Sequence, residues 1–380
     1  MKCYHTGISL QREVLSAMTP LDYAKAACDT MMRKFFAPDL PPKGHFHYHQ
    51  GVFLSGMHGT WQLTQEKKYF DYIKAWVDSV FDENGGIREC SFADLDDIQP
   101  GILLFPLLDE TKDSRYEKCL SSVYEEVRAI PRNAQGGYWH KTKTPDQMWL
   151  DGLYMAGPFC AEYAHRYHLP ELADDTVHQA LLMKQVTGDE KTGLLRHAWD
   201  GRREAPWADP ETGRAPEFWG RSLGWVPVAL LNEMDFLPHD HPGYAALREM
   251  AVGLLTALCR YQSEDGRWYQ VVDKGGKEGN WLENSCSCLY AAALCKAVRL
   301  GMMEKQYLDA AKRGYEGVIR SLSWSGGDLL IGNVCVGTGV GDYAFYCARP
   351  TSVNDLHGVG AFLLMCVEMQ KCLDSRKEDA

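Results

Sequence analysis

Several features that define large protein classes are missing from this 380-residue chain. It contains no run of five or more Lys and Arg, and its formal net charge is −11. The chain therefore lacks the basic surface that nucleic acids and anionic membranes require. No apolar run approaches the roughly 18 residues that cross a bilayer. We expect neither a nucleic-acid partner nor a membrane partner.

Signs of secretion are also absent. The first 20 residues contain no continuous apolar stretch that could act as a signal peptide. The 13 cysteines are scattered and odd in number, unlike the paired cysteines of a disulfide-rich secreted domain. We expect reduced thiols and a cytoplasmic location.

Motifs for nucleotide and metal chemistry are weak or missing. The Gly-rich segment 337–341 lacks the Lys-Ser/Thr of a phosphate-binding loop, and no Gly-x-Ser-x-Gly elbow surrounds any serine. His45, His47 and His49 alternate, as metal ligands on one side of a strand would. No cysteine or carboxylate close by in the sequence completes a ligand set, so we expect no metal and no cofactor. The role of the three histidines is left open.

What the chain does contain is helical periodicity. Thr19-Pro20 is typical of a helix start, and the apolar residues after it recur every three or four positions. The same pattern predicts helices near residues 20–36, 48–64, 67–81, 94–109, 114–130, 146–166, 170–187, 217–235, 241–262, 282–299, 304–321 and 353–372.

Short links centred on glycine separate pairs of these helices. They recur about every 50 to 75 residues, at segments 84–87, 135–138, 192–194, 265–267 and 325–328. Such recurrence indicates a repeated helix pair. We predict an all-α fold, an (α/α)6 barrel that forms a single domain over residues 1–380, with 375–380 as a solvated tail. An open helical solenoid that binds protein partners is the alternative.

A carboxylate in an apolar helix is the strongest candidate for chemistry. In segment 146–155, Asp146 is expected to cap the helix, and Asp151 then lies one turn in, among apolar and aromatic neighbours. Burial would favour the protonated acid more than the helix dipole favours the anion. Asp151 could then donate a proton near neutral pH. The structural alternative is an ion pair or a hydrogen bond to a neighbouring helix.

Other polar residues stand out in similar contexts. Asp96 lies at a predicted helix start and could serve as a second carboxylate or as an acceptor for ligand hydroxyls, or it could simply cap the helix. Arg221 stands between Trp219 and Trp225, where it could hold a carboxylate or pack on the rings. His197 lies in a glycine-link region, where loop residues reach the mouth of a barrel, or it is an ordinary surface residue.

Together, four segments resemble the unsaturated rhamnogalacturonyl hydrolases of glycoside hydrolase family 105, which are related to unsaturated glucuronyl hydrolases. The matching segments are residues 95–101, 147–155, 219–225 and 337–362. The resemblance implies a six-hairpin helical barrel. It also implies removal of an unsaturated galacturonyl residue from the non-reducing end of pectin-derived disaccharides, with no cofactor.

The resemblance also implies roles for individual residues. Asp151 matches the general acid/base of that family. The residues implied to line the sugar site are Asp96, His197, Trp219, Arg221, Trp149, Lys141 and Tyr48.

The expected reaction is hydration of the C4=C5 double bond by one acid/base group. An ordinary two-carboxylate glycosidase that uses Asp96 and Asp151 is one alternative, and a sugar epimerase on the same barrel is another. The expected partner is a small unsaturated oligosaccharide bound by a monomer or a homodimer. The leaving sugar is left open.

Overall fold

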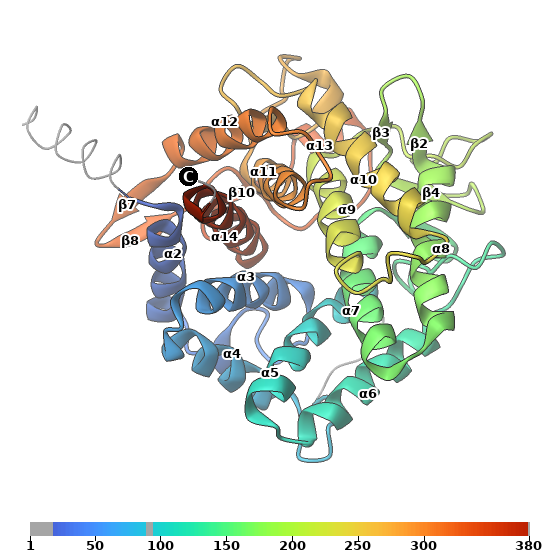
Figure 1. Cartoon of the computed structure of the whole chain (residues 1–380). Coiled ribbons are helices and arrows are strands. Elements are labelled where there is room, and N and C mark those ends of the chain that lie inside the picture. Colours follow the sequence, from blue (N-terminus) through green and yellow to red (C-terminus); the bar gives the residue numbers. More distant parts are fainter. Residues whose placement is uncertain (1–17, 89–93, 379–380) are drawn as a thin grey trace, which may run out of the picture.

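The computed structural model describes residues 18–88 and 94–378. Within them, helices alternate between an outer and an inner ring around one axis (Figure 1). The outer ring consists of α2 (Pro20–Lys34), α4 (Lys67–Val80), α6 (Arg115–Ala129), α8 (Pro170–Thr187), α10 (Tyr244–Cys259) and α12 (Tyr307–Arg320). The inner ring consists of α3 (Tyr48–Thr64), α5 (Leu104–Thr111), α7 (Asp151–Tyr167), α9 (Gly220–Glu233), α11 (Asn284–Arg299) and α14 (Leu356–Glu378). The predicted (α/α)6 barrel is confirmed.

Short elements decorate the connections between the helices. Five two-stranded antiparallel sheets pair β1 (Gln147–Trp149) with β4 (Ala198–Asp200), β2 (Gly188–Asp189) with β3 (Leu194–Leu195), β5 (Trp268–Tyr269) with β6 (Leu282–Glu283), β7 (Ser323–Ser325) with β8 (Asp328–Leu330), and β9 (Val334–Cys335) with β10 (Thr351–Ser352). Single helical turns are η1 (Ala37–Asp39), η2 (Leu95–Asp97), η3 (Gln99–Leu103), η4 (Val272–Lys274) and the short helix α13 (Tyr343–Cys347).

The glycine-centred links have the backbone that the sequence predicted. Positive φ angles of 73° to 94° occur at Gly85, Gly136, Gly193, Gly266 and Gly327. A side chain at these positions would be strained, so glycine is the residue that lets the chain reverse there. These glycine-centred links therefore mark the reversals between the helices of the repeat.

The predicted helix 146–166 begins too early. Residues 147–149 instead form β1, whose backbone pairs with β4, and the helix starts at Asp151. Asp146 does not cap it: its φ is 59°, and its carboxylate accepts a hydrogen bond from Trp139 Nε1 and pairs with Arg202. The predicted helix 94–109 likewise opens with two 3-10 turns, η2 and η3, before α5 begins. In both segments, contacts distant in sequence override the local periodicity.

The inner helices α7, α9 and α11 are buried on nearly every side because they lie between the outer ring and the interior of the barrel. α14 differs from the expectation that no segment is long and apolar enough to cross a membrane: its window Leu356–Ser375 meets that test by length and composition, and 78% of the window is buried inside the protein. Apolar residues on all faces are what an inner helix of this fold requires.

The barrel closes where α14 packs against α3 (Figure 1). A Cβ atom on Gly360 would lie only 2.5 Å from the backbone carbon and oxygen of Val52. The two helix backbones can approach this closely only because residue 360 has no side chain.

We expect Gly360→Ala to lower the free energy of unfolding by about 3 kcal/mol, because α3 and α14 must separate to admit the methyl group. Chemical unfolding monitored by circular dichroism measures this change. The control is Gly253→Ala on α10, where a Cβ would meet no atom within 4 Å. That substitution should raise stability by about 0.5–1 kcal/mol, the usual gain of Ala over Gly in a helix. Equal effects of the two substitutions would contradict this account of the seam.

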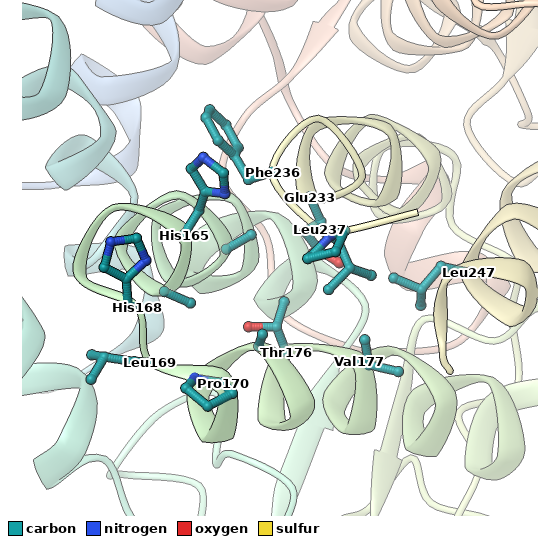
Figure 2. A pocket seen from close by; sticks show the side chains of 14 residues that line it. His165, His168, Leu169, Pro170, Thr176, Val177, Glu233, Phe236, Leu237 and Leu247 are labelled. Atoms are coloured by element: carbon teal, nitrogen blue, oxygen red, sulfur yellow. The ribbon is translucent and has the colours of Figure 1, made fainter. Parts of the chain in front are cut away.

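A cavity lies at the end of the barrel where the inner helices α7 and α9 end, next to the start of α8 (Figure 2). It has a volume of about 220 Å³ and mostly apolar walls. Glu233, the last residue of α9, is 1% exposed, and its Oε2 has no hydrogen-bond partner. Burial alone raises the pKa of Glu233 to about 8.

This buried acid should make stability fall as the pH rises. Between pH 4.5 and 8 the folded state keeps the Glu233 proton while the unfolded chain releases it, so ionisation favours unfolding. We expect Glu233→Gln to be more stable than the parent by about 3 kcal/mol at pH 7, and the difference to shrink toward pH 4.5. Urea unfolding of both proteins at a series of pH values tests this. Parallel pH dependences of the two proteins would show that Glu233 is not held neutral.

Candidate active site

A cavity of about 340 Å³ opens at the end of the barrel where the inner helices begin. Tyr48 and Asp151 are the first residues of α3 and α7, and Arg221 is the second residue of α9. Helix N-termini carry partial positive charge, so this end of the barrel suits an anionic ligand. The lining residues are His47, Tyr48, His49, Asp96, His140, Lys141, Trp149, Asp151, Trp219, Arg221, Gly337, Thr338, Gly339 and Arg349.

The structure brings together all eight residues that the sequence predicted for the site. Seven of them line the cavity directly. The eighth, His197, is fully buried behind it, and its Nε2 lies 3.1 Å from Asp151 Oδ2. The predicted residues therefore lie in one cluster, although they come from segments far apart in sequence.

The strand pair β1–β4 places Asp151 beside His197. Trp149 is paired with Ala198 in the sheet, and the N–H of Leu150 donates to the carbonyl of His197 at 2.9 Å. The chain then turns into α7, so Asp151 emerges next to the imidazole. The sheet that replaced the first predicted turn of the helix is thus what positions the acid.

Asp151 is buried, as predicted, but it is not held neutral in the unliganded protein. Burial raises its pKa, and the charge of Asp96 raises it further. The hydrogen bond with His197, together with the charges of His197 and His140, outweighs both, and the pKa of Asp151 lies below its ordinary value. The prediction that apolar surroundings alone keep this acid protonated is wrong, because a histidine from a distant link faces it.

Asp96 is held as an anion. Lys141 Nζ donates to Asp96 Oδ2 at 2.8 Å and to Asp94 Oδ2 at 3.1 Å. His140 Nε2 lies 3.5 Å from the other oxygen of Asp96. Although burial raises the pKa of Asp96, the charges of His140 and Lys141 lower it to about 2. A carboxylate with this pKa is a weak base.

Arg221 is buried and already bound to the protein. Its Nη1 donates to the carbonyl of Cys335 at 2.6 Å and its Nη2 to the carbonyl of Val336 at 3.0 Å. Its guanidinium also lies 4.5 Å from the centre of the Trp219 ring. Arg221 thus fixes the segment after β9 over the cavity, and its remaining N–H groups are left for a ligand.

The two predicted tryptophans are held in place by polar and aromatic contacts. Trp149 stacks on His140 with ring centres 4.5 Å apart, and its Nε1 donates to Gln147. Trp219 stacks on Tyr346 at 5.9 Å, and its Nε1 donates to Gln270. Both rings are oriented before any ligand arrives, which favours recognition of a flat face of a sugar.

Sequence reasoning missed several residues of this site. Tyr346 from α13 lies with its hydroxyl 2.6 Å from His197 Nδ1, so it orients the histidine that contacts Asp151. Arg349 lines the cavity and donates to the carbonyl of Gly337. Tyr346 and Arg349 both lie in segment 337–362, which resembles the family, but the resemblance implied no role for either residue. His140 directly precedes Lys141 and gave no separate signal.

Two of the three alternating histidines, His47 and His49, also line the cavity. His47 Nε2 lies 3.9 Å from Asp96 Oδ2, and His47 Nδ1 lies 2.9 Å from His49 Nδ1. Burial lowers the pKa of His49 to about 3. His47 and His49 therefore belong to the polar wall of the site, whereas His45 is exposed.

The chain is similar in sequence or in structure to several known proteins. A glycoside hydrolase of family 105 from C. acetobutylicum ATCC 824 is 33% identical, with a TM-score of 0.88 over 92% of this chain and 99% of that chain. The unsaturated rhamnogalacturonyl hydrolase YesR of Bacillus subtilis (strain 168) is 26% identical over 256 residues, which are 66% of this chain and 70% of YesR. Protein Atu3128 of Agrobacterium fabrum is 33% identical over 230 residues, which are 56% of this chain and 97% of that protein.

The family model described as Glycosyl Hydrolase Family 88 matches residues 23–373, which include every described helix of the barrel's two rings except the first residues of α2 and the end of α14. The match therefore covers the complete cavity with its acid, its cations and its two tryptophans. On this evidence the chain belongs to glycosyl hydrolase family 88 and is a glycosidase.

Proposed function

We propose that the enzyme removes an unsaturated (4,5-ene) galacturonyl or related uronyl residue from the non-reducing end of pectin-derived, rhamnogalacturonan oligosaccharides. The observation that carries the proposal is one buried acid, Asp151, bound to His197 inside a cavity that also contains Lys141, Arg221 and Arg349. An unsaturated uronyl sugar requires an acid that protonates its double bond and cationic side chains that bind its carboxylate. The activity of YesR and the family of the C. acetobutylicum relative support the same substrate class.

The proposed reaction starts with protonation of the double bond. The C4=C5 bond is part of an enol ether, so C4 accepts the proton of Asp151 and positive charge develops at C5, shared with the ring oxygen. Water then attacks C5 and returns a proton to the Asp151 carboxylate. The resulting hemiketal opens and releases the neighbouring sugar with its hydroxyl group. The protonated form of Asp151 is regenerated, and the proposed reaction requires no cofactor.

Substrate binding supplies the protonated form of Asp151. In the unliganded protein its pKa is lowered by His197 and His140. The uronate adds a negative charge, and the bound sugar displaces water from the cavity; both effects raise the pKa of a carboxyl group. The acid is thus protonated when the substrate is in place, and the His197–Tyr346 pair keeps it oriented.

The two-carboxylate alternative fits the structure less well. An inverting glycosidase needs a second carboxylate that activates water, and a retaining one needs a nucleophile. Asp96 is tied to Lys141 and flanked by two histidines, and its pKa is about 2. It suits the binding of sugar hydroxyls and the placement of the Lys141 charge better than it suits catalysis of a proton transfer.

Ultraviolet absorbance separates these mechanisms. Incubation with lyase-generated unsaturated disaccharides should abolish the absorbance of the conjugated enol acid at the same rate as the neighbouring sugar appears. Simple glycosidic cleavage would release the sugar and leave the absorbance intact, and that result would refute hydration. A panel that varies the second sugar, with rhamnose, another neutral sugar or an amino sugar, identifies the leaving group. The cytoplasmic location remains a prediction, which cell fractionation tests.

A further inference from the structure

A second polar cluster lies where the first and last inner helices meet. His49 is the second residue of α3, His357 is the second residue of α14, and Asp355 directly precedes α14. His49 Nε2, Asp355 Oδ1 and His357 Nδ1 all lie within 4.8 Å of one another. Atoms bound to one zinc ion at about 2.0–2.2 Å lie roughly 3–4 Å apart, so small shifts of these side chains would let all three contact one ion.

His357 and Asp355 are in close polar contact at the centre of this cluster. His357 is fully buried, and its Nε2 lies 3.0 Å from the carbonyl oxygen of Cys335, which can only accept a proton. In the neutral ring, Nδ1 then carries a lone pair. Nδ1 lies 2.7 Å from Asp355 Oδ1. Either a second proton on His357 or a bound metal ion would join these two atoms, and the experiment below separates the two cases.

The other polar atoms of the cluster are held as those of metal ligands are. His49 Nδ1 lies 2.9 Å from His47 Nδ1, which leaves His49 Nε2 facing Asp355 Oδ1 at 3.9 Å. Ser352 Oγ donates to the second oxygen of Asp355 at 3.2 Å. Metal-binding histidines and carboxylates typically engage their remaining atom in this way, which fixes the direction of the ligating lone pair.

We propose that His49, Asp355 and His357 bind one divalent transition-metal ion, of which Zn²⁺ is the best match to two imidazoles and one carboxylate. The ion joins the first turn of α3 to the first turn of α14 and closes the barrel at its seam. It also fixes the His49–His47 pair that borders the active-site cavity. The role is structural, so the inference does not depend on the proposed reaction.

The test uses the full chain, treated with a chelator and then titrated with Zn²⁺ or Co²⁺ alone. We expect one equivalent of Zn²⁺ by calorimetry, visible absorption bands with Co²⁺, and a melting temperature several degrees higher in the presence of Zn²⁺. His49→Ala and Asp355→Asn should each weaken binding more than about 100-fold, because each removes a direct ligand. His45→Ala changes an exposed histidine of the same motif and should bind the metal as the parent does.

Circular dichroism without metal shows which variants fold. If Asp355→Asn does not fold, His49→Gln decides, because its side chain is partly exposed and its loss leaves no buried charge. The proposal is overturned if the folded parent binds no stoichiometric metal. It is equally overturned if His49→Ala or His49→Gln retains parental affinity. A catalytically inactive protein that still binds one Zn²⁺ would refute the proposed function and leave this inference intact.

Discussion

Asp151→Asn is expected to lower kcat for an unsaturated uronyl disaccharide at least about 10³-fold, while the protein still folds and binds the substrate. General acid–base catalysis contributes about 10²–10⁴-fold in enzymes, and in the proposed reaction one side chain acts first as the acid and then as the base. The carboxamide can still bond with His197 Nε2, so the local structure should be retained. Absorbance decay gives kcat, and calorimetry with the intact disaccharide gives the affinity.

Asp146→Asn is the matched control for this prediction. Asp146 lies in the same segment, but its carboxylate contacts Trp139 and Arg202 and does not line the cavity. Its replacement should leave kcat within a few-fold of the parent. If Asp151→Asn kept most of the activity, or if both variants lost it equally, Asp151 would not be the acid.

Asp96→Asn should reduce kcat/KM about 10²-fold or more and move the pH optimum to lower pH. The negative charge of Asp96 raises the pKa of Asp151, so its removal lowers that pKa. The protonated acid is then present only in more acidic solution, and activity is lost at a lower pH on the alkaline side. Lys141 also loses its shorter ion pair and with it part of its orientation. A pH profile of kcat/KM from pH 4 to 9 measures both effects.

Asp94→Asn is the control that separates charge from position. Asp94 is the other partner of Lys141, at 3.1 Å, but it does not line the cavity. This variant weakens the hold on Lys141 and leaves the Asp96 charge in place, so the pH optimum should stay where it is in the parent. An unchanged pH optimum in Asp96→Asn would mean that Asp96 does not act on the acid.

The sequence predicted the barrel and its repeats because both depend on local patterns. Apolar spacing defined the helices, and the glycines at 85, 136, 193, 266 and 327 marked reversals that need positive φ. The predicted start of a helix was wrong where a segment distant in sequence pairs with its first residues. Residues 147–149 pair with 198–200, a segment about 50 residues away, and no local periodicity contains that information.

The candidate site likewise combines residues that the sequence could select with properties that depend on distant segments. Asp151, Asp96 and Arg221 could be selected from the sequence because each is a charged residue in apolar company, which requires a partner or a function. Their protonation could not be predicted. The pKa of Asp151 depends on His197, and that of Asp96 on His140 and Lys141, all of which arrive from other segments. A metal site at His45, His47 and His49 was discounted because no further ligand lies nearby in the sequence, and Asp355 lies 306 residues after His49.

The sequence by itself determined the helical repeat and the family and selected Asp151 as the candidate acid, because residue spacing and short motifs carry this information. Only the tertiary structure decided the charge state of that acid and the partners of each histidine. The physical reason is that electrostatic and hydrogen-bond energies depend on distances of a few ångströms, and folding alone sets those distances between residues remote in the chain.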